Sequence, residues 1–176
     1  MNIAWVLIYC MSLMRHETNR VICRCAEYLL HGETNLRLYF NYRELWHQLA
    51  QEGAISCANA YAIDRNNPQQ QGFQQVLREI GFTVKLKPYI QRIDGSAKGD
   101  WDVGIAIDMM DAAINQTTPI DCAVLLSGDG DFDLLLQRLS VAGIDTLVYG
   151  VPELTATSLI NAATEFRAIE GALLLK

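Results

Sequence analysis

Few residues in this sequence are of the kinds that mark disordered, fibrous or disulfide-linked proteins. It has 4 Pro and 12 Gly among 176 residues, and 51% of the residues are hydrophobic, which excludes a disordered chain, a collagen and a linker-rich array. The five cysteines are odd in number and include no C-x-x-C pair, so neither a disulfide framework nor a zinc site is indicated. The length suits one domain with a sizeable core, and the cysteine usage indicates a reducing, cytoplasmic compartment.

Positive charge and long apolar stretches are also scarce. Lys and Arg number 14 against 20 Asp and Glu, which gives a formal net charge of −6. That balance argues against tight non-specific binding to a nucleic-acid backbone, because such affinity comes from neutralising phosphates. It leaves room for a local basic groove or for a metal site built from carboxylates. The longest apolar stretch, residues 3–14, is too short to span a bilayer, so we expect a soluble protein without a membrane partner.

Short apolar runs alternate with longer segments of helical period along the chain. The expected strands are residues 3–9, 56–63, 83–87, 122–127 and 145–149. The expected helices are residues 17–30, 42–51, 68–80, 100–115 and 132–141, with a last helix near 155–163 that closes the chain. This alternation is typical of βαβ units and predicts an α/β fold with a mainly parallel sheet. Because residues 122–127 are apolar on both faces, we expect them inside the sheet, and ligands of such sheets lie beyond the carboxyl ends of the strands.

Two carboxylates follow that strand at once. Asp129 and Asp131 are each preceded by a glycine, so the backbone can turn tightly and both side chains can converge on one point. Paired carboxylates repel each other unless a cation compensates them, and Mg²⁺ prefers such oxygen ligands. The alternative is structural: Asp131 caps the helix that begins at Phe132, and Asp129 is a turn residue. An EF-hand is excluded, since Leu134 stands where its glycine is required.

The helix expected at 100–115 carries further acids. The residues expected to face the core, at spacing i, i+4, i+7, are Val103, Ile107 and Met110. Asp102 and Asp108 are about 240° apart around such a helix, so at most one of them can reach a metal ion. Asp102, in the first turn, lies nearer to the carboxyl edge of the sheet and is the better candidate, although the helix dipole also favours a carboxylate there.

One stretch of the chain is locally basic. It contains Lys85, Lys87, Tyr89, Arg92 and Lys98. Basic residues interleaved with an aromatic ring suit a single-stranded nucleic-acid track, and a sheet edge kept soluble by lysines explains them equally well. Lys98 can hold a phosphate as a point charge or be a solvated loop lysine. The sequence contains no nucleotide-binding loop and no hydrolase nucleophile elbow.

Three segments of this chain together resemble one family. They are residues 87–108, 124–139 and 148–169, and their most specific parts are S-G-D-G-D-F, which begins at Ser127, and K-G-D-W-D-V, which begins at Lys98. These segments resemble the NYN domain proteins of the LabA-like group, which are relatives of the PIN-domain nucleases. The resemblance implies a single NYN domain over residues 1–176, a PIN-like three-layer α/β/α sandwich, and a ribonuclease that depends on Mg²⁺ or Mn²⁺.

The resemblance also implies a role for each matching residue. Its catalytic and metal-binding carboxylates would be Asp102, Asp129 and Asp131. Ser127 and Lys98 would contact the substrate, although the K-G-V-D spacing of the family is one residue shorter than K-G-D-W-D here. Asp108 matches a later helix acid with a supporting role. The expected partner is RNA held through a short, local contact, with a homo-oligomer or a protein partner as a further option.

The first strand departs from this family. Its members end that strand with an Asp followed shortly by an Asn, whereas this chain has no Asp before Asp64. The residues in that place are Leu7, Ile8 and Tyr9. Residues 1–39 are therefore a divergent N-terminal portion, explained by a frameshifted or misassigned start or by a true divergence that disabled catalysis. Three acids in place of four would hold a cation more weakly. The alternative function is thus a catalytically impaired NYN module that acts by binding RNA or protein.

Overall fold

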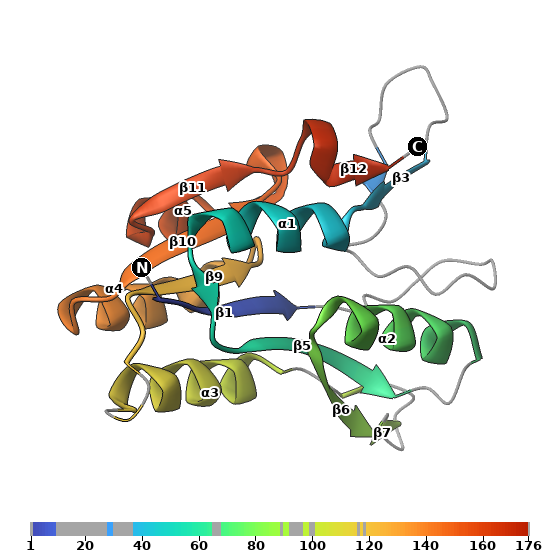
Figure 1. The fold of residues 1–176 in the computed structure, drawn as a ribbon, viewed down its shortest axis with the longest axis horizontal. Helices are drawn as coiled ribbons and strands as arrows, with labels where there is room; N and C mark the ends of the chain where they lie inside the picture. Colours follow the sequence, from blue (N-terminus) through green and yellow to red (C-terminus); the bar gives the residue numbers. More distant parts are fainter. Residues whose placement is uncertain are drawn as a thin grey trace.

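A parallel sheet forms the centre of the molecule. The computed structural model describes residues 2–9, 28–29, 37–64, 68–88, 90–91, 97–98, 101–115, 117 and 119–175. Its largest sheet has seven strands in the order β11-β10-β9-β1-β5-β6, with β4 beside the start of β1, and each of its pairings is parallel (Figure 1). These strands are β1 (Asn2–Tyr9), β4 (Ala54–Ile55), β5 (Ala58–Asp64), β6 (Thr83–Pro88), β9 (Cys122–Leu126), β10 (Asp145–Gly150) and β11 (Glu165–Ala168).

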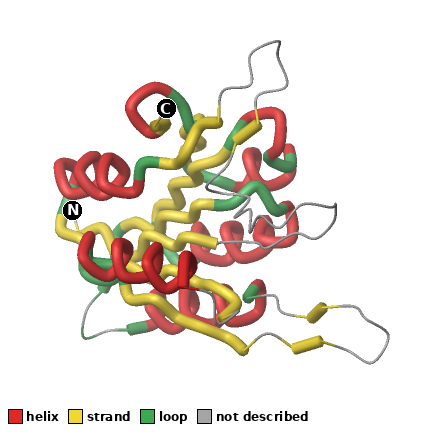
Figure 2. The backbone as a smooth tube through the Cα atoms, turned by 90° about the vertical axis from the view of Figure 1, so that its right-hand side faces the viewer, coloured by secondary structure: helices red, strands yellow, loops and turns green. Residues whose placement is uncertain are grey.

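Helices cover both faces of this sheet, as Figure 2 shows. They are α1 (Tyr42–Glu52), α2 (Pro68–Ile80), α3 (Asp102–Ile114), α4 (Asp133–Val141) and α5 (Thr157–Ala162). One hydrophobic cluster packs α1 and α2 onto one face, and a second packs α3, α4 and α5 onto the other. Strand β9 is buried throughout and divides its side chains between the two clusters, with Val124 and Leu126 in the first and Ala123 and Leu125 in the second. The predicted three-layer α/β/α sandwich is confirmed, and β9 lies inside its sheet.

Five of the seven main-sheet strands lie where the sequence predicts them, and the short strands β4 and β11 were not predicted. All five expected strands are present, and their ends shift by at most two residues. Strand β1 lies between β5 and β9, where Val6 pairs with Ala58 on one side and with Val124 on the other. The divergent N-terminal portion therefore contributes an interior strand of the sheet.

Short strands near both ends of the described chain were not predicted. Helix α5 does not close the chain, because β11 follows it and then, after the 3₁₀ turn η3 (Gly171–Leu173), β12 (Leu174–Leu175). Strand β12 pairs antiparallel with β3 (Arg37–Phe40), which also pairs with β2 (Tyr28–Leu29). The helix expected at 17–30 is thus wrong at 28–29, and its other residues lie outside the described ones. Strands of two to four residues are too short for a hydrophobic period to show.

The buried side of α3 also differs from the prediction. Val103 is 66% exposed and Ile107 55% exposed, and Met110 is only partly buried. The buried residues of this helix are Ile105, Met109 and Ala112. They have the same i, i+4, i+7 spacing as the predicted set, because α3 is apolar on both sides. Periodicity alone therefore allows two orientations of this helix, and packing against the sheet selects the second.

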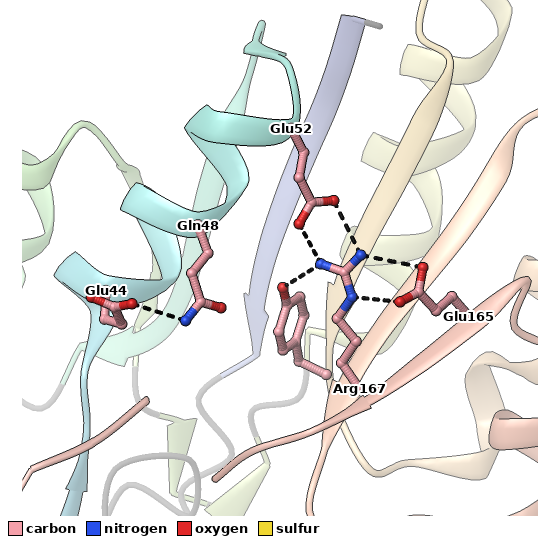
Figure 3. Close-up of polar contacts among 6 residues, drawn as sticks. Glu44, Gln48, Glu52, Glu165 and Arg167 are labelled. Carbon is pink, nitrogen blue, oxygen red and sulfur yellow. Dashed lines mark hydrogen bonds and ion pairs between the residues drawn. The ribbon is translucent and has the colours of Figure 1, made fainter. Parts of the chain in front are cut away.

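One charged network ties α1 to the far edge of the sheet (Figure 3). The Arg167 guanidinium on β11 donates to the Glu52 carboxylate at 2.5 and 3.1 Å and to the Glu165 carboxylate at 2.6 and 3.2 Å. It also donates to the Tyr149 hydroxyl on β10 at 3.0 Å. The hydrogen bond from Arg167 lowers the pKa of Glu165 from its ordinary value. Since Glu52 ends α1, the network fixes this helix against β10 and β11.

Two of the five cysteines, Cys57 and Cys122, lie in the described part of the chain, and both are free thiols. Burial raises the pKa of the Cys122 thiol to about 11, which keeps it protonated at neutral pH. Among the helices that the structure describes, none has the length and apolar character needed to cross a membrane.

Candidate functional site

The loop after β9 is shaped by hydrogen bonds to its own side chains. Ser127 is buried, and its Oγ accepts the Asp129 N–H at 3.1 Å. Asp129 Oδ1 in turn accepts the Asp131 N–H at 3.0 Å and caps the 3₁₀ turn η1 (Gly130–Phe132). Of the structural alternative, the turn role of Asp129 is confirmed and the capping role of Asp131 is wrong, because Asp129 is the capping side chain and α4 begins after Phe132 without one. One compact turn thus holds both acids at the carboxyl end of a buried strand.

Both glycines of this loop lie close to the segment around the start of α5, and Gly128 is required by that approach. The Gly128 carbonyl accepts the Ala156 N–H at 3.0 Å. A Cβ atom on Gly128 would lie 2.6 Å from the Leu154 carbonyl oxygen, and one on Gly130 would lie 3.0 Å from the Ala156 Cβ. A side chain at position 128 would therefore displace backbone. The S-G-D-G-D-F motif is accordingly a packing motif as well as a source of carboxylates.

Asp102 is placed at the carboxyl edge by the tryptophan before it. It is the first residue of α3, and its Oδ1 atom is shielded from solvent. The Trp101 indole N–H donates to the Ala62 carbonyl near the end of β5 at 2.9 Å. Its ring centroid lies 5.0 Å from that of Tyr61, and Lys87 Nζ stands 4.4 Å above the ring. Because Trp101 is held by β5 and β6, the start of α3 is fixed relative to the sheet.

Asp108 faces the sheet at a second point along α3. Its Oδ2 accepts the Tyr61 hydroxyl and lies 2.6 Å from Lys85 Nζ. Burial, and then the hydrogen bond to Asp108, raise the pKa of Tyr61 far above its ordinary value. Asp108 therefore anchors α3 to β5 and β6. The sequence analysis did not single out Tyr61 or Trp101, because their contacts depend on the β5–β6 register that pairs Tyr61 with Lys85.

The three acids singled out from the sequence lie on one edge of the sheet. Helix α3, which begins with Asp102 on the side toward which the β1 arrow points in Figure 1, contacts the η1 turn that contains Asp131. Within the described residues, no three His, Cys, Asp or Glu side chains are grouped so that they could hold a metal ion. The donor chemistry nevertheless suits Mg²⁺, which is commonly held by one or two carboxylates while waters and substrate phosphates fill its other positions.

Of the two residues expected to contact substrate, the structure describes the side chain of Ser127 and only the backbone of Lys98. The buried Ser127 hydroxyl supports the acidic turn through Asp129. Lys98 lies in β8 (Ala97–Lys98), where it pairs with Ile90 of β7 (Ile90–Gln91) in a hairpin that precedes α3. The Lys98 side chain is outside the described part of the structure.

Comparison with known proteins decides the family. Residues 25–170 match the model of the NYN domain. The chain belongs to the NYN domain family. This is a PIN-like nuclease family, and the matched part of our NYN domain protein contains Asp102, Asp129 and Asp131. Strand β1 lies before the matched residues, although it is an interior strand of the sheet.

Two relatives support the same assignment. The NYN domain protein is 29% identical over 136 residues to the low amplitude and bright protein LabA of Synechococcus elongatus, across 73% of this chain and 71% of LabA. It is also similar to the crystal structure of a protein of unknown function from Vibrio parahaemolyticus, with a TM-score of 0.71 and 48% sequence identity over 78% of this chain and 83% of that one. The resemblance to the LabA-like group is thereby confirmed.

Proposed function

We propose that this NYN domain protein is a metal-dependent ribonuclease that hydrolyses phosphodiester bonds in RNA. The observation that supports it best is the loop after β9, in which Asp129 and Asp131 share one turn beside the helix that begins with Asp102. In parallel α/β sheets, ligands bind at this carboxyl edge. Carboxylates there are the donors that Mg²⁺ and Mn²⁺ favour.

In this proposal the residues at the carboxyl edge of the sheet have different roles. Asp102, Asp129 and Asp131 would hold Mg²⁺ or Mn²⁺. When bound, such an ion supplies positive charge for the scissile phosphate and acidifies the attacking water. Ser127 keeps the Asp129 N–H, and with it the turn, in place. Lys98 would meet a phosphate as a point charge. The net charge of −6 limits RNA binding to a short, local contact.

Cleavage of a labelled single-stranded RNA tests this proposal. We expect cleavage by the unmodified protein in Mn²⁺ and none in EDTA. Asp129→Asn should lose the activity. Asp145→Asn makes the same charge change at the amino end of β10, away from the acidic turn, and should keep it. Cleavage that persists in EDTA or in Asp129→Asn would contradict the proposal.

A second function, RNA or protein binding by a catalytically impaired NYN domain, is favoured by β1. This strand is an interior one, and Asn2–Tyr9 contains neither Asp nor Glu. The nucleases that the sequence resembles carry an Asp at the end of their first strand, so a cation would be held here by fewer carboxylates. Binding of RNA without any cleavage in Mn²⁺ would support this second function and exclude the first.

A further inference from the structure

Helix α3 is apolar on the side that faces away from the sheet. Val103, Ile107 and Ile114 lie four and seven residues apart, which places them on one side of the helix, and they are 66%, 55% and 67% exposed. The opposite side packs into the core through Ile105 and Met109. Large apolar side chains gathered on an exposed surface are typical of a site that contacts a partner. The outer side of α3 therefore has the character of an interface.

Helix α4 carries a second row of exposed apolar side chains. Leu134 and Val141 are seven residues apart on one side of that helix, and they are 71% and 79% exposed. Helices α3 and α4 contact each other and cover the same face of the sheet. We call the surface they form the α3–α4 face; its residues are Val103, Ile107, Ile114, Leu134 and Val141. At these exposures, no described element covers it.

Each helix carries one charge within its apolar row, and the two charges are opposite. On α3, Asp111 stands between Ile107 and Ile114; on α4, Arg138 stands between Leu134 and Val141. Both rows have the spacing apolar at i, charged at i+4 and apolar at i+7. Asp111 and Arg138 are exposed, and neither forms an ion pair with any residue that the structure describes. The two rows are thus complementary in charge and alike in spacing.

We propose that this protein forms a two-fold symmetric homodimer through the α3–α4 face. In a two-fold interface the same surface is used twice. A contact of α3 with the partner's α4 is therefore accompanied by the symmetry-related contact of α4 with the partner's α3. The rows described above satisfy this condition. Asp111 meets the partner's Arg138, Arg138 meets the partner's Asp111, and the apolar side chains on either side of each pair exclude water. The occupant that the face fits is therefore a second copy of this chain.

Molar mass in solution tests the dimer. Sedimentation and light scattering should give twice the chain mass of 19.7 kDa for the unmodified protein. Ile107→Glu and Leu134→Glu place a charge in the apolar rows at exposed positions, so they should leave the circular dichroism spectrum intact and yield monomers. Val76→Glu makes a similar change at a 40% exposed position on α2, which covers the other face of the sheet, and should remain dimeric.

A charge swap provides the sharper test, because it needs no loss of apolar surface. Asp111→Arg alone and Arg138→Asp alone should each weaken the dimer about tenfold or more, since each places like charges together. The double variant should recover the dimer. A monomeric unmodified protein would overturn the proposal and leave the face to a different partner or to another segment of this chain. A dimer that survives Ile107→Glu and both single swaps would overturn it as well.

Discussion

Lys85 Nζ lies 2.6 Å from Asp108 Oδ2, and this ion pair joins the edge strand β6 to helix α3. The same oxygen accepts the hydroxyl of Tyr61 on β5, so one carboxylate holds two strands. Trp101 binds the same two strands at the start of the helix. The position of Asp102 at the sheet edge is thus set by contacts on β5 and β6.

Removing this carboxylate should destabilise the protein. Asp108→Ala leaves the buried Tyr61 hydroxyl and the partly buried Lys85 without their shared acceptor, at a cost of about 1–3 kcal/mol. Urea unfolding measures the loss. Asp145→Ala, at an exposed strand position, serves as the control and should stay within about 0.5 kcal/mol of the unmodified protein. Equal losses in the two variants would show that the anchor contributes nothing specific.

The Arg167 network should make the free energy of unfolding depend on pH in the acidic range. Arg167 holds the pKa of Glu165 below its ordinary 4.5, so folding favours the charged carboxylate. The charged Glu165 carboxylate stabilises the folded protein fully at pH values above that ordinary pKa. This stabilisation is lost as the pH falls through the lowered pKa. Glu165→Gln should therefore be less stable at neutral pH, and its unfolding free energy should fall less steeply on acidification.

Urea unfolding at a series of pH values measures this slope. Glu170→Gln, at an exposed carboxylate outside the network, is the matched control and should retain the steep slope of the unmodified protein. If the two variants have the same slope, Glu165 has no part in the acid response.

The acidic turn should not tolerate a side chain at its first glycine. In Gly128→Ala the new Cβ would stand 2.6 Å from the Leu154 carbonyl oxygen, so backbone must move, at a cost of about 1–3 kcal/mol. Gly72→Ala is the matched control. Gly72 is an exposed residue in the middle of α2, and no atom lies within 4 Å of the position that its Cβ would occupy. Alanine there should stabilise the helix by about 0.5–1 kcal/mol. Thermal unfolding of the two variants should shift in opposite directions; a Gly128→Ala protein as stable as the unmodified one would contradict the described loop packing.

Divalent cations should stabilise the folded protein if the acidic edge holds them. A ligand that binds only the native state raises stability by about 2.7 kcal/mol at a hundred times its dissociation constant. We expect Mg²⁺ and Mn²⁺ to raise the melting temperature of the unmodified protein and of Asp145→Asn. The rise should disappear in Asp129→Asn and Asp131→Asn. This readout needs no substrate, so it separates cation binding from cleavage; a rise that persists in both variants would place the cation elsewhere.

Local patterns in the chain account for the strands that were predicted correctly and for the position of the acidic turn after β9. The five long strands each contain enough apolar residues for the pattern to be visible, and Asp129 and Asp131 follow one of these strands directly. The strands β2 and β12 contain two residues each, and they exist only because β3 offers them a partner. No window of sequence contains that information. The roles of Asp102, Asp129 and Asp131 in cation binding stay predictions.

The sequence by itself determined the alternation of strands and helices, the family and the acidic turn after β9, because these depend on residues that are neighbours in the chain. Only the tertiary structure decided which side of α3 is buried, since Val103 and Ile105 begin rows of the same spacing. It also decided that Lys85 meets Asp108, 23 residues further on. Both outcomes depend on how α3 packs against β5 and β6, and the free energy of that packing is shared among segments that no local pattern connects.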